Sequence, residues 1–225
     1  VKGYANYNTA VAMMALLTAK DPAYETALRR ARSFLVGLQN DLGESGKPDT
    51  PYDGGIGYGS RYPHSDLNNT LLALEALHHS RHLVADQGQA GKDLDWAAAI
   101  RFLQNCQNLP SHNNATNLST DPANLGGFHY YPGFSQAGDV KNSVTGRVSL
   151  RSYGSAGYAG LLSYVYADLK ADDPRVEAAM TWLGENYTLE ENPGMGQQGL
   201  FYYLQLITKA LKTSGRDHLE TGDGR

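Results

Sequence analysis

The segment Ala31–Gln39, with the sequence ARSFLVGLQ, carries the pattern from which the architecture of this chain follows, because the pattern returns twice. AIRFLQNCQ begins at Ala99, and AMTWLGENY begins at Ala179. All three segments share A-x-x-[FW]-L, and the first two end in glutamine, Gln39 and Gln107. A pattern that returns at long intervals is typical of helical repeats, in which each unit buries its apolar face against its neighbours.

Each copy of the pattern is expected in a helix with a charged, exposed face. An acidic start precedes each copy, in KDPAYETAL, KDLDWAAA and DDPRVEAA. Asp21 and Asp173 are each followed by proline, which predicts an N-cap and a first helical position. A glycine-rich turn follows each copy: GGIGY from Gly54, GGFHY from Gly126 and PGMGQQG from Pro193.

A second kind of helix, nearly free of charge, is predicted after each turn. It is built from glycine, alanine, serine, leucine and tyrosine, so it can be buried on most sides. These helices are expected within 65–77, 151–169 and 196–211, and the opening segment 6–17 belongs to the same kind. The sequence therefore predicts an all-α fold, an α/α toroid forming an incomplete barrel of repeated outer and inner helix pairs. A superhelical solenoid is the alternative, and no sheet is expected.

Long polar loops are expected to gather at one end of this ring. NDLGESGKPDTPYDGG and NLPSHNNATNLSTDPANLGG lie between an outer helix and the next turn, and PGFSQAGDVKNSVTGRVSL precedes the helix at Arg151. Loops of this length in a compact domain are usually functional or disordered. DVKNSVTGR within the third is expected to be a solvated loop. We expect one domain over 1–225, with 213–225 as a flexible tail.

The composition excludes several classes of function. The net charge of -4 argues against nucleic-acid binding. A single cysteine, Cys106, excludes an intrachain disulfide and any zinc site built from cysteines. The longest apolar run, Ala10–Leu17, is far shorter than a membrane-spanning helix requires. No cofactor is indicated, and neither the cytoplasm nor an exported location is favoured.

The repeat core A-x-x-F-L-x-x-x-Q, followed by a glycine-rich turn with an aromatic end, resembles the QW repeat of squalene–hopene and oxidosqualene cyclases. It is also similar to the repeat of protein prenyltransferase β subunits. Gln39 and Gln107 stand at the glutamine position, and Tyr58 and Tyr130 stand at the aromatic end. The resemblance covers nearly the whole chain and implies the α/α toroid. Since such toroids normally have more helix pairs, we expect a C-terminal part of a longer toroid, whose N-terminal part would be its partner.

The resemblance also directs attention to DLNNT, Asp66–Thr70. Squalene–hopene-type cyclases carry D-x-D-D-T at the start of an inner helix, where the central acid protonates the terminal alkene. Asp66 matches the first acid of this motif, whereas Asn68 and Asn69 replace the next two. Because asparagine cannot supply a proton, Asp66 is the only candidate catalytic acid. The alternative is that Asp66 is the N-cap of an ordinary helix.

Two related families contribute no further chemistry. Prenyltransferases hold zinc with an aspartate, a cysteine and a histidine, but the chain has no Asp-x-Cys pair, and Cys106 is expected to be a packed residue. The segment around Met195 resembles the G-C-G-E-Q motif of toroidal thioester domains, but methionine cannot form the thioester.

His78 and His82 have the i, i+4 spacing of a metal pair, yet histidines also favour helix ends. No metal site is therefore predicted.

The candidate ligand-binding residues flank the turns or lie on the uncharged helices. They are Tyr62, His64, Asn68, Asn69, His129, Tyr130, Arg151, Tyr153, Tyr158 and Tyr202. Aromatic residues around a central axis would suit an isoprenoid or other apolar ligand, because π-faces also stabilise cations. Plain core packing of the tyrosines is the alternative.

Three functions are consistent with this sequence. The first is a terpenoid cyclase- or prenyltransferase-like toroid domain that binds an isoprenoid or other apolar ligand in a central cavity, with Asp66 as the acid if the domain is catalytic. The second is a non-catalytic binding or scaffolding domain. The third is a carbohydrate-active α/α barrel that uses a polar rim expected to contain Asp53, Arg61, His64, Asp66, His129 and Arg151.

Overall fold

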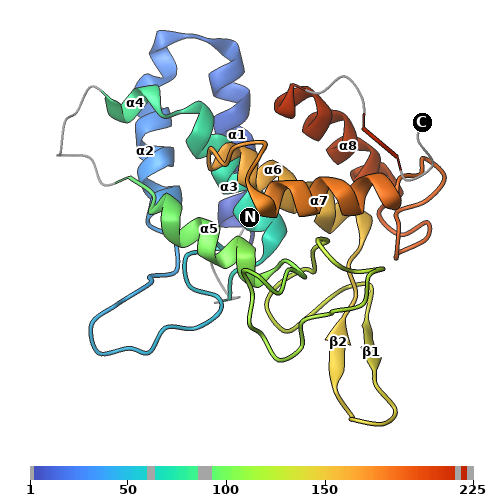
Figure 1. Ribbon diagram of the computed structural model, residues 1–225. Coiled ribbons are helices and arrows are strands. Elements are labelled where there is room, and N and C mark those ends of the chain that lie inside the picture. The colour runs from blue at the N-terminus through green and yellow to red at the C-terminus, as the bar shows by residue number, and fades with distance from the viewer. Residues whose placement is uncertain (1–2, 60–63, 86–92, 216–218, 222–225) are drawn as a thin grey trace. The chain divides into compact units, whose positions relative to one another are not determined.

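The computed structural model describes residues 3–59, 64–85, 93–215 and 219–221, and this part of the chain is mostly helical (Figure 1). In chain order the elements are α1 Ala5–Ala19, the 3-10 helix η1 Pro22–Tyr24, α2 Glu25–Val36, α3 Leu67–His79, α4 His82–Ala85, α5 Trp96–Asn105, β1 Asp139–Lys141, β2 Val148–Leu150, α6 Gly154–Tyr166, α7 Pro174–Glu185 and α8 Leu200–Ser214. The contacts divide the chain into two compact units, 1–102 and 103–225. Each unit has its own core.

The first unit is built around α3, which packs against α1 and α2. Leucines at four turns of α3 are almost completely buried, namely Leu67, Leu71, Leu74 and Leu77. The helix carries almost no charge, so it can be enclosed on most sides. The sequence correctly predicts this uncharged helix, and it correctly predicts that α2 buries apolar residues on one face only.

The second unit is built around α6 in the same way, and α6 packs against α7 and α8. All but one of its residues are buried, including Tyr158, Tyr164 and Tyr166. Gly160 makes this packing possible, because a Cβ atom there would collide with the ring of Phe128. Small residues therefore allow α6 to be enclosed by bulky neighbours.

Side-chain caps begin three of the helical segments where the sequence predicts them. Asp21 accepts a hydrogen bond from the backbone N–H of Ala23 at 2.9 Å, and Asp173 accepts one from Arg175 at 3.0 Å. Asp66 caps α3. The residues after Asp21 first form the short 3-10 helix η1, so the α-helix itself begins only at Glu25.

The predicted repeat is visible as one hydrogen-bonded clamp that occurs in both units. In the first unit, Nε2 of Gln39 donates to the carbonyl of Gly54 at 2.9 Å and to that of Asp95 at 2.8 Å. In the second unit, Nε2 of Gln107 donates to the carbonyl of Gly126 and to that of Arg175, both at 2.9 Å. The repeated glutamine thus ties the end of one charged helix to the following turn and to the region where the next charged helix begins.

The glycine pairs of the turns lie directly beneath that next charged helix. Gly54 and Gly126 have φ angles of 87° and 88°, and a Cβ atom at either would collide with the carbonyl oxygen of Ala98 or Ala178 respectively. The following glycine of each pair contacts Phe102 or Trp182, the aromatic residues of the repeat pattern. The aromatic residue of the first copy, Phe34, is 42% exposed instead.

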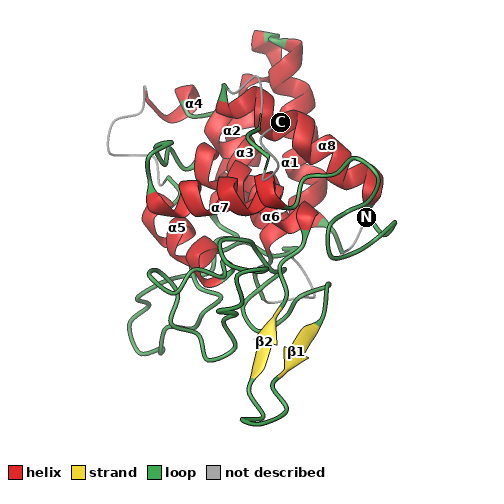
Figure 2. Ribbon diagram, turned by 45° about the vertical axis from the view of Figure 1, so that its right-hand side comes forward, coloured by secondary structure: helices red, strands yellow, loops and turns green. Residues whose placement is uncertain are grey.

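The prediction of no sheet is wrong for residues 139–150, which form a two-stranded hairpin (Figure 2), although residues 139–147 are exposed to solvent as expected. β1 and β2 are antiparallel, and Val140 lies opposite Ser149. Oδ1 of Asn142 accepts hydrogen bonds from the N–H groups of Val144 and Thr145 and so shapes the turn. The guanidinium of Arg147 donates to the carbonyls of residues 116 and 118, so the hairpin is anchored by contacts distant in sequence.

Three further predictions concern the fold class, the domain organisation and the C-terminal tail. The mostly helical structure agrees with the all-α class apart from this hairpin, while the toroid and the single-domain organisation stay predictions. The expected tail, 213–225, begins within α8 and lies partly outside the described residues. Among the described helices, none is long and apolar enough to cross a membrane.

Candidate functional site

Asp66, the candidate acid, is completely buried at the start of α3. Its Oδ1 accepts a hydrogen bond from the backbone N–H of Asn69 at 2.9 Å, and its Oδ2 accepts one from Nδ2 of Asn69 at 2.7 Å. The first contact is that of an N-cap, which satisfies one of the backbone donors left open at a helix start. Both oxygens of the carboxylate therefore serve the first turn of their own helix.

Asn69 connects this cap to α1 through Asn6. Nδ2 of Asn6 donates to the carbonyl of Asn69 at 2.9 Å and to that of Gly57 at 3.0 Å. Asn6 is completely buried, and its Oδ1 has no hydrogen-bond partner within the described chain. The two asparagines thus form a polar link between the uncharged helices of the first unit. Asn68, by contrast, is only half-buried.

His64 lies at the edge of a polar cleft of about 400 Å³ in the first unit. Its ring lies 5.9 Å from that of Tyr52, and Asn40 and Asp53 also line the cleft. Asp53 accepts hydrogen bonds from the N–H and the hydroxyl of Thr50, at 2.6 and 2.9 Å. The cleft presents aromatic rings beside carboxylate and amide groups. Tyr62, the neighbouring candidate, lies outside the described residues.

His129 is a fully buried histidine in the second unit. Burial lowers the pKa of its imidazole to about 4, although the nearby backbone of Asn105 acts in the opposite direction. Neither ring nitrogen has a hydrogen bond of good geometry within the described residues. His129 is therefore a neutral, enclosed imidazole at neutral pH.

The aromatic candidates on α6 and α8 mostly form the core of the second unit. Tyr158 is buried, and its ring lies 5.6 Å from that of Tyr203. Burial raises the pKa of Tyr158, and its hydroxyl lacks a partner in the described part of the unit. Tyr153 is the buried N-cap residue of α6, whereas Tyr202 is half-buried on α8.

The last two candidates lie on the turns of the second unit. The ring of Tyr130 lies 5.3 Å from that of Tyr131 and 6.4 Å from that of Phe134, forming a partly exposed aromatic cluster. Arg151 is exposed, and its backbone N–H donates to the carbonyl of Gly138 at 3.1 Å. The cluster resembles an aromatic platform more than a catalytic arrangement.

The structure brings together some of the predicted residues within each unit. In the first unit, Asp66 and Asn69 are joined by hydrogen bonds. His129, Tyr153 and Tyr158 all belong to the second unit. Sequence reasoning missed Asn6, whose only signal is an amide beside an apolar helix, and Tyr164, which completes the clamp by donating its hydroxyl to Oε1 of Gln107 at 2.9 Å.

Metal binding has no support in the part of the chain that the structure describes. That part contains no group of three histidine, cysteine or carboxylate residues able to hold an ion. Cys106 is completely buried as a packed residue just after α5, as the sequence predicts. No protein family, curated protein or solved structure matches the chain.

Proposed function

We propose that the chain is a non-catalytic domain that binds an isoprenoid or another apolar ligand, built on an α/α toroid like that of squalene–hopene cyclases. The observation that carries this proposal is the bonding of Asp66. Both of its oxygens accept hydrogen bonds from Asn69. These are the bonds of a helix cap, whereas a proton donor also has to carry a hydrogen on one oxygen and present it to the substrate.

The neighbours of Asp66 support the same conclusion. Cyclisation of a polyene needs a strong acid in a dry pocket, with groups that stabilise its conjugate base. At the two positions where the cyclase motif has further acids, this chain has asparagines, and Asn69 is committed to Asp66 and Asn6. The domain therefore keeps the helix start of the cyclases without the acid that performs their chemistry.

The second unit supplies the support for ligand binding. It is rich in buried tyrosines, and two of its enclosed polar groups, the His129 imidazole and the Tyr158 hydroxyl, lack a hydrogen-bond partner within the described residues. Burying such groups without partners is unfavourable, by about 1–3 kcal/mol each. A ligand with an apolar body and a polar group would relieve part of that cost.

The test combines binding and turnover. The chain is incubated with squalene, farnesyl diphosphate and geranylgeranyl diphosphate, and binding of farnesol is measured by calorimetry. We expect farnesol to bind and no cyclised product to form. Asp66→Asn should retain the binding and the cap bond to the backbone N–H of Asn69, although it loses the bond from Nδ2 of Asn69. Asp66→Ala should also lose the cap, which costs about 1 kcal/mol of stability. Product formation that Asp66→Asn abolishes would overturn the proposal.

A second candidate function is binding of a carbohydrate or other polyol, favoured by the cleft beside His64. Rings of Tyr52 and His64 lie beside carboxylates there, which is the combination that stacks on a sugar face and binds its hydroxyls. Titration with mono- and disaccharides, followed by amide NMR, checks this function. Shifts confined to residues 40–53 and 64 would support it, and no shift at millimolar sugar would exclude it.

A further inference from the structure

A groove of about 600 Å³ lies in the first unit, at the end of α3 opposite Asp66. Four segments line it: the end of α1, the turn into α2 together with the start of α2, the end of α3 and the start of α4. Its volume falls within the range of about 300–1,000 Å³ that is usual for small-molecule sites. None of the residues predicted from the sequence as a site lines it.

The floor of the groove is aliphatic and incompletely covered. Leu28 and Leu83 are buried in it, whereas Met14, Leu16 and Leu17 are half-exposed. Half-exposed side chains in a concave place leave apolar surface in contact with water, and covering that surface is favourable by about 25 cal/mol for each Å². The groove is therefore suited to a flexible apolar chain.

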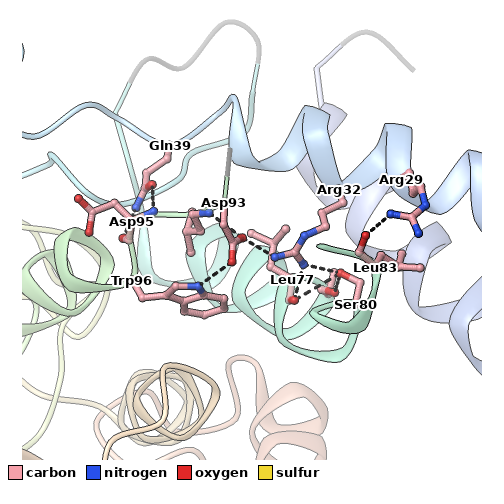
Figure 3. A network of polar contacts seen from close by, with 11 residues as sticks. Arg29, Arg32, Gln39, Leu77, Ser80, Leu83, Asp93, Asp95 and Trp96 are labelled. Atoms are coloured by element: carbon pink, nitrogen blue, oxygen red, sulfur yellow. Dashed lines mark hydrogen bonds and ion pairs between the residues drawn. The ribbon is translucent and has the colours of Figure 1, made fainter. Parts of the chain in front are cut away.

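Two arginines of α2 hold the walls of the groove in place (Figure 3). Arg29 donates to the carbonyl of Leu83 and so ties α4 to α2. One turn further along α2, Arg32 donates to the carbonyl of Leu77 at 2.5 Å and to the hydroxyl of Ser80 at 2.7 Å, which fixes the end of α3. Arg32 also pairs with Asp93. The groove is thus shaped before any ligand arrives, which lowers the cost of ordering on binding.

The rim determines which head group fits. Lys20, His79 and His82 supply donors, and Asp21 and Glu25 supply carboxylates. Asp21 caps η1 and Glu25 pairs with Arg29 at 2.7 Å, so neither sign of charge is in clear excess at the rim. A fully charged head would face a like charge on one side, whereas a hydroxyl can donate to the acids and accept from the cations.

We propose that this groove binds an uncharged amphiphile with one flexible apolar chain and a hydroxyl head. The inference rests on the proposed function, which expects an isoprenoid or other apolar ligand. It adds a head-group chemistry and a binding site in the first unit, different from the buried His129 and Tyr158 of the second unit. The apolar chain lies along Met14, Leu17 and Leu83, and the hydroxyl lies at the rim beside Lys20 and His82.

The four methionines of the chain provide a direct test. The methyl groups are labelled with carbon-13, and NMR spectra of the whole chain are followed during addition of farnesol or dodecanol. Met14 lines the groove and Met13, the preceding residue, is buried, whereas Met180 and Met195 belong to the second unit. We expect a saturable shift of Met14 without shifts of Met180 and Met195, and Met14→Leu assigns the signal with little change in packing.

Two further comparisons define the site. Leu17→Gln should weaken binding about tenfold, because it removes apolar surface from the floor. Leu189→Gln, at an exposed leucine of the second unit, should leave binding unchanged. Dodecyl phosphate and dodecyltrimethylammonium should each bind about tenfold more weakly than dodecanol. An unshifted Met14, or equal affinities of the wild type and Leu17→Gln, would overturn the inference.

The same titrations separate this inference from the proposed function. Farnesol that shifts only Met180 or Met195 would leave the isoprenoid-binding function standing and remove the groove as its site. Dodecanol that shifts Met14 while farnesol binds nowhere would support the groove and remove the isoprenoid ligand.

Discussion

The hydroxyl of Tyr164 donates a hydrogen bond to Oε1 of Gln107 at 2.9 Å, and both side chains are completely buried. Burial also raises the pKa of Tyr164 well above its ordinary value, so the hydroxyl keeps its proton. The amide of Gln107 is thereby satisfied on both sides, since its Nε2 donates to two carbonyls. In the first unit the equivalent donor is a backbone group, because Oε1 of Gln39 accepts a hydrogen bond from the N–H of Asp95.

We expect Tyr164→Phe to lower the free energy of unfolding by about 1–3 kcal/mol, because Oε1 of Gln107 would be buried without a donor. Urea unfolding measures the change. Tyr24→Phe, at an exposed tyrosine, serves as the control and should be nearly neutral. Equal stabilities of the wild type and Tyr164→Phe would mean that the clamp does not depend on this hydroxyl.

Gly126→Ala should prevent folding or cost several kcal/mol, because its Cβ would collide with the carbonyl oxygen of Ala178. Gly138→Ala is the matched control, since Gly138 has a similar φ of 80° and no atom lies near its Cβ position. The control should show only backbone strain, about 1–3 kcal/mol. Thermal unfolding of both variants compares the two effects, and similar losses would show that the close approach is unimportant.

Arg32→Lys should destabilise the first unit, although it conserves the charge. Arg32 serves the Leu77 carbonyl, the Ser80 hydroxyl and Asp93 at once, and the point charge of lysine cannot reproduce this fork. We expect a loss of about 2–3 kcal/mol in urea unfolding, as for a buried charge-assisted hydrogen bond. Arg30→Lys on the exposed side of α2 should change stability little. If both variants behave alike, the fork geometry of Arg32 in Figure 3 adds nothing to stability, and a lysine charge is sufficient there.

The stability of the second unit should fall as the pH falls from about 6.5 to about 4. Burial lowers the pKa of His129 to about 4, whereas the unfolded chain has an ordinary histidine. Between these values the unfolded state binds more protons, so acid favours unfolding, by about 3 kcal/mol in total. His129→Gln should flatten this part of the pH profile. The exposed His79→Gln should leave it unchanged, and an unaltered slope in His129→Gln would contradict the assignment.

Local rules predicted the helices of this chain well. The caps at Asp21 and Asp173 and the run after Asp66 depend on neighbouring residues alone, and each forms as expected. The hairpin at 139–150 was missed because its strands span only three residues each and Arg147 anchors it to a segment far away in sequence. Strands this short are stabilised by tertiary contacts, which the local sequence does not reveal.

The site was less predictable than the helices. The sequence left Asp66 with two interpretations, and only the positions of the Asn69 donors show that it is a cap. The groove could not be foreseen, because Met14, Leu28 and Leu83 come from separate helices and carry no shared pattern. His129 was a candidate from its place beside a turn, but its burial depends on the packing of the whole second unit.

The loops 41–53 and 109–125 each close on the same pair of backbone bonds, from Asn40 to Gly54 and Gly55 and from Asn108 to Gly126 and Gly127. The two bonds close the base of each loop, so a change of length beyond them does not have to shift the register of the helices on either side. Doubling such a loop costs only about 0.6 kcal/mol of closure entropy. The first loop can therefore accept an exchanged or lengthened segment within 41–50, which is mostly exposed, whereas the second also holds Arg147 through the carbonyls of residues 116 and 118 and has to keep that part.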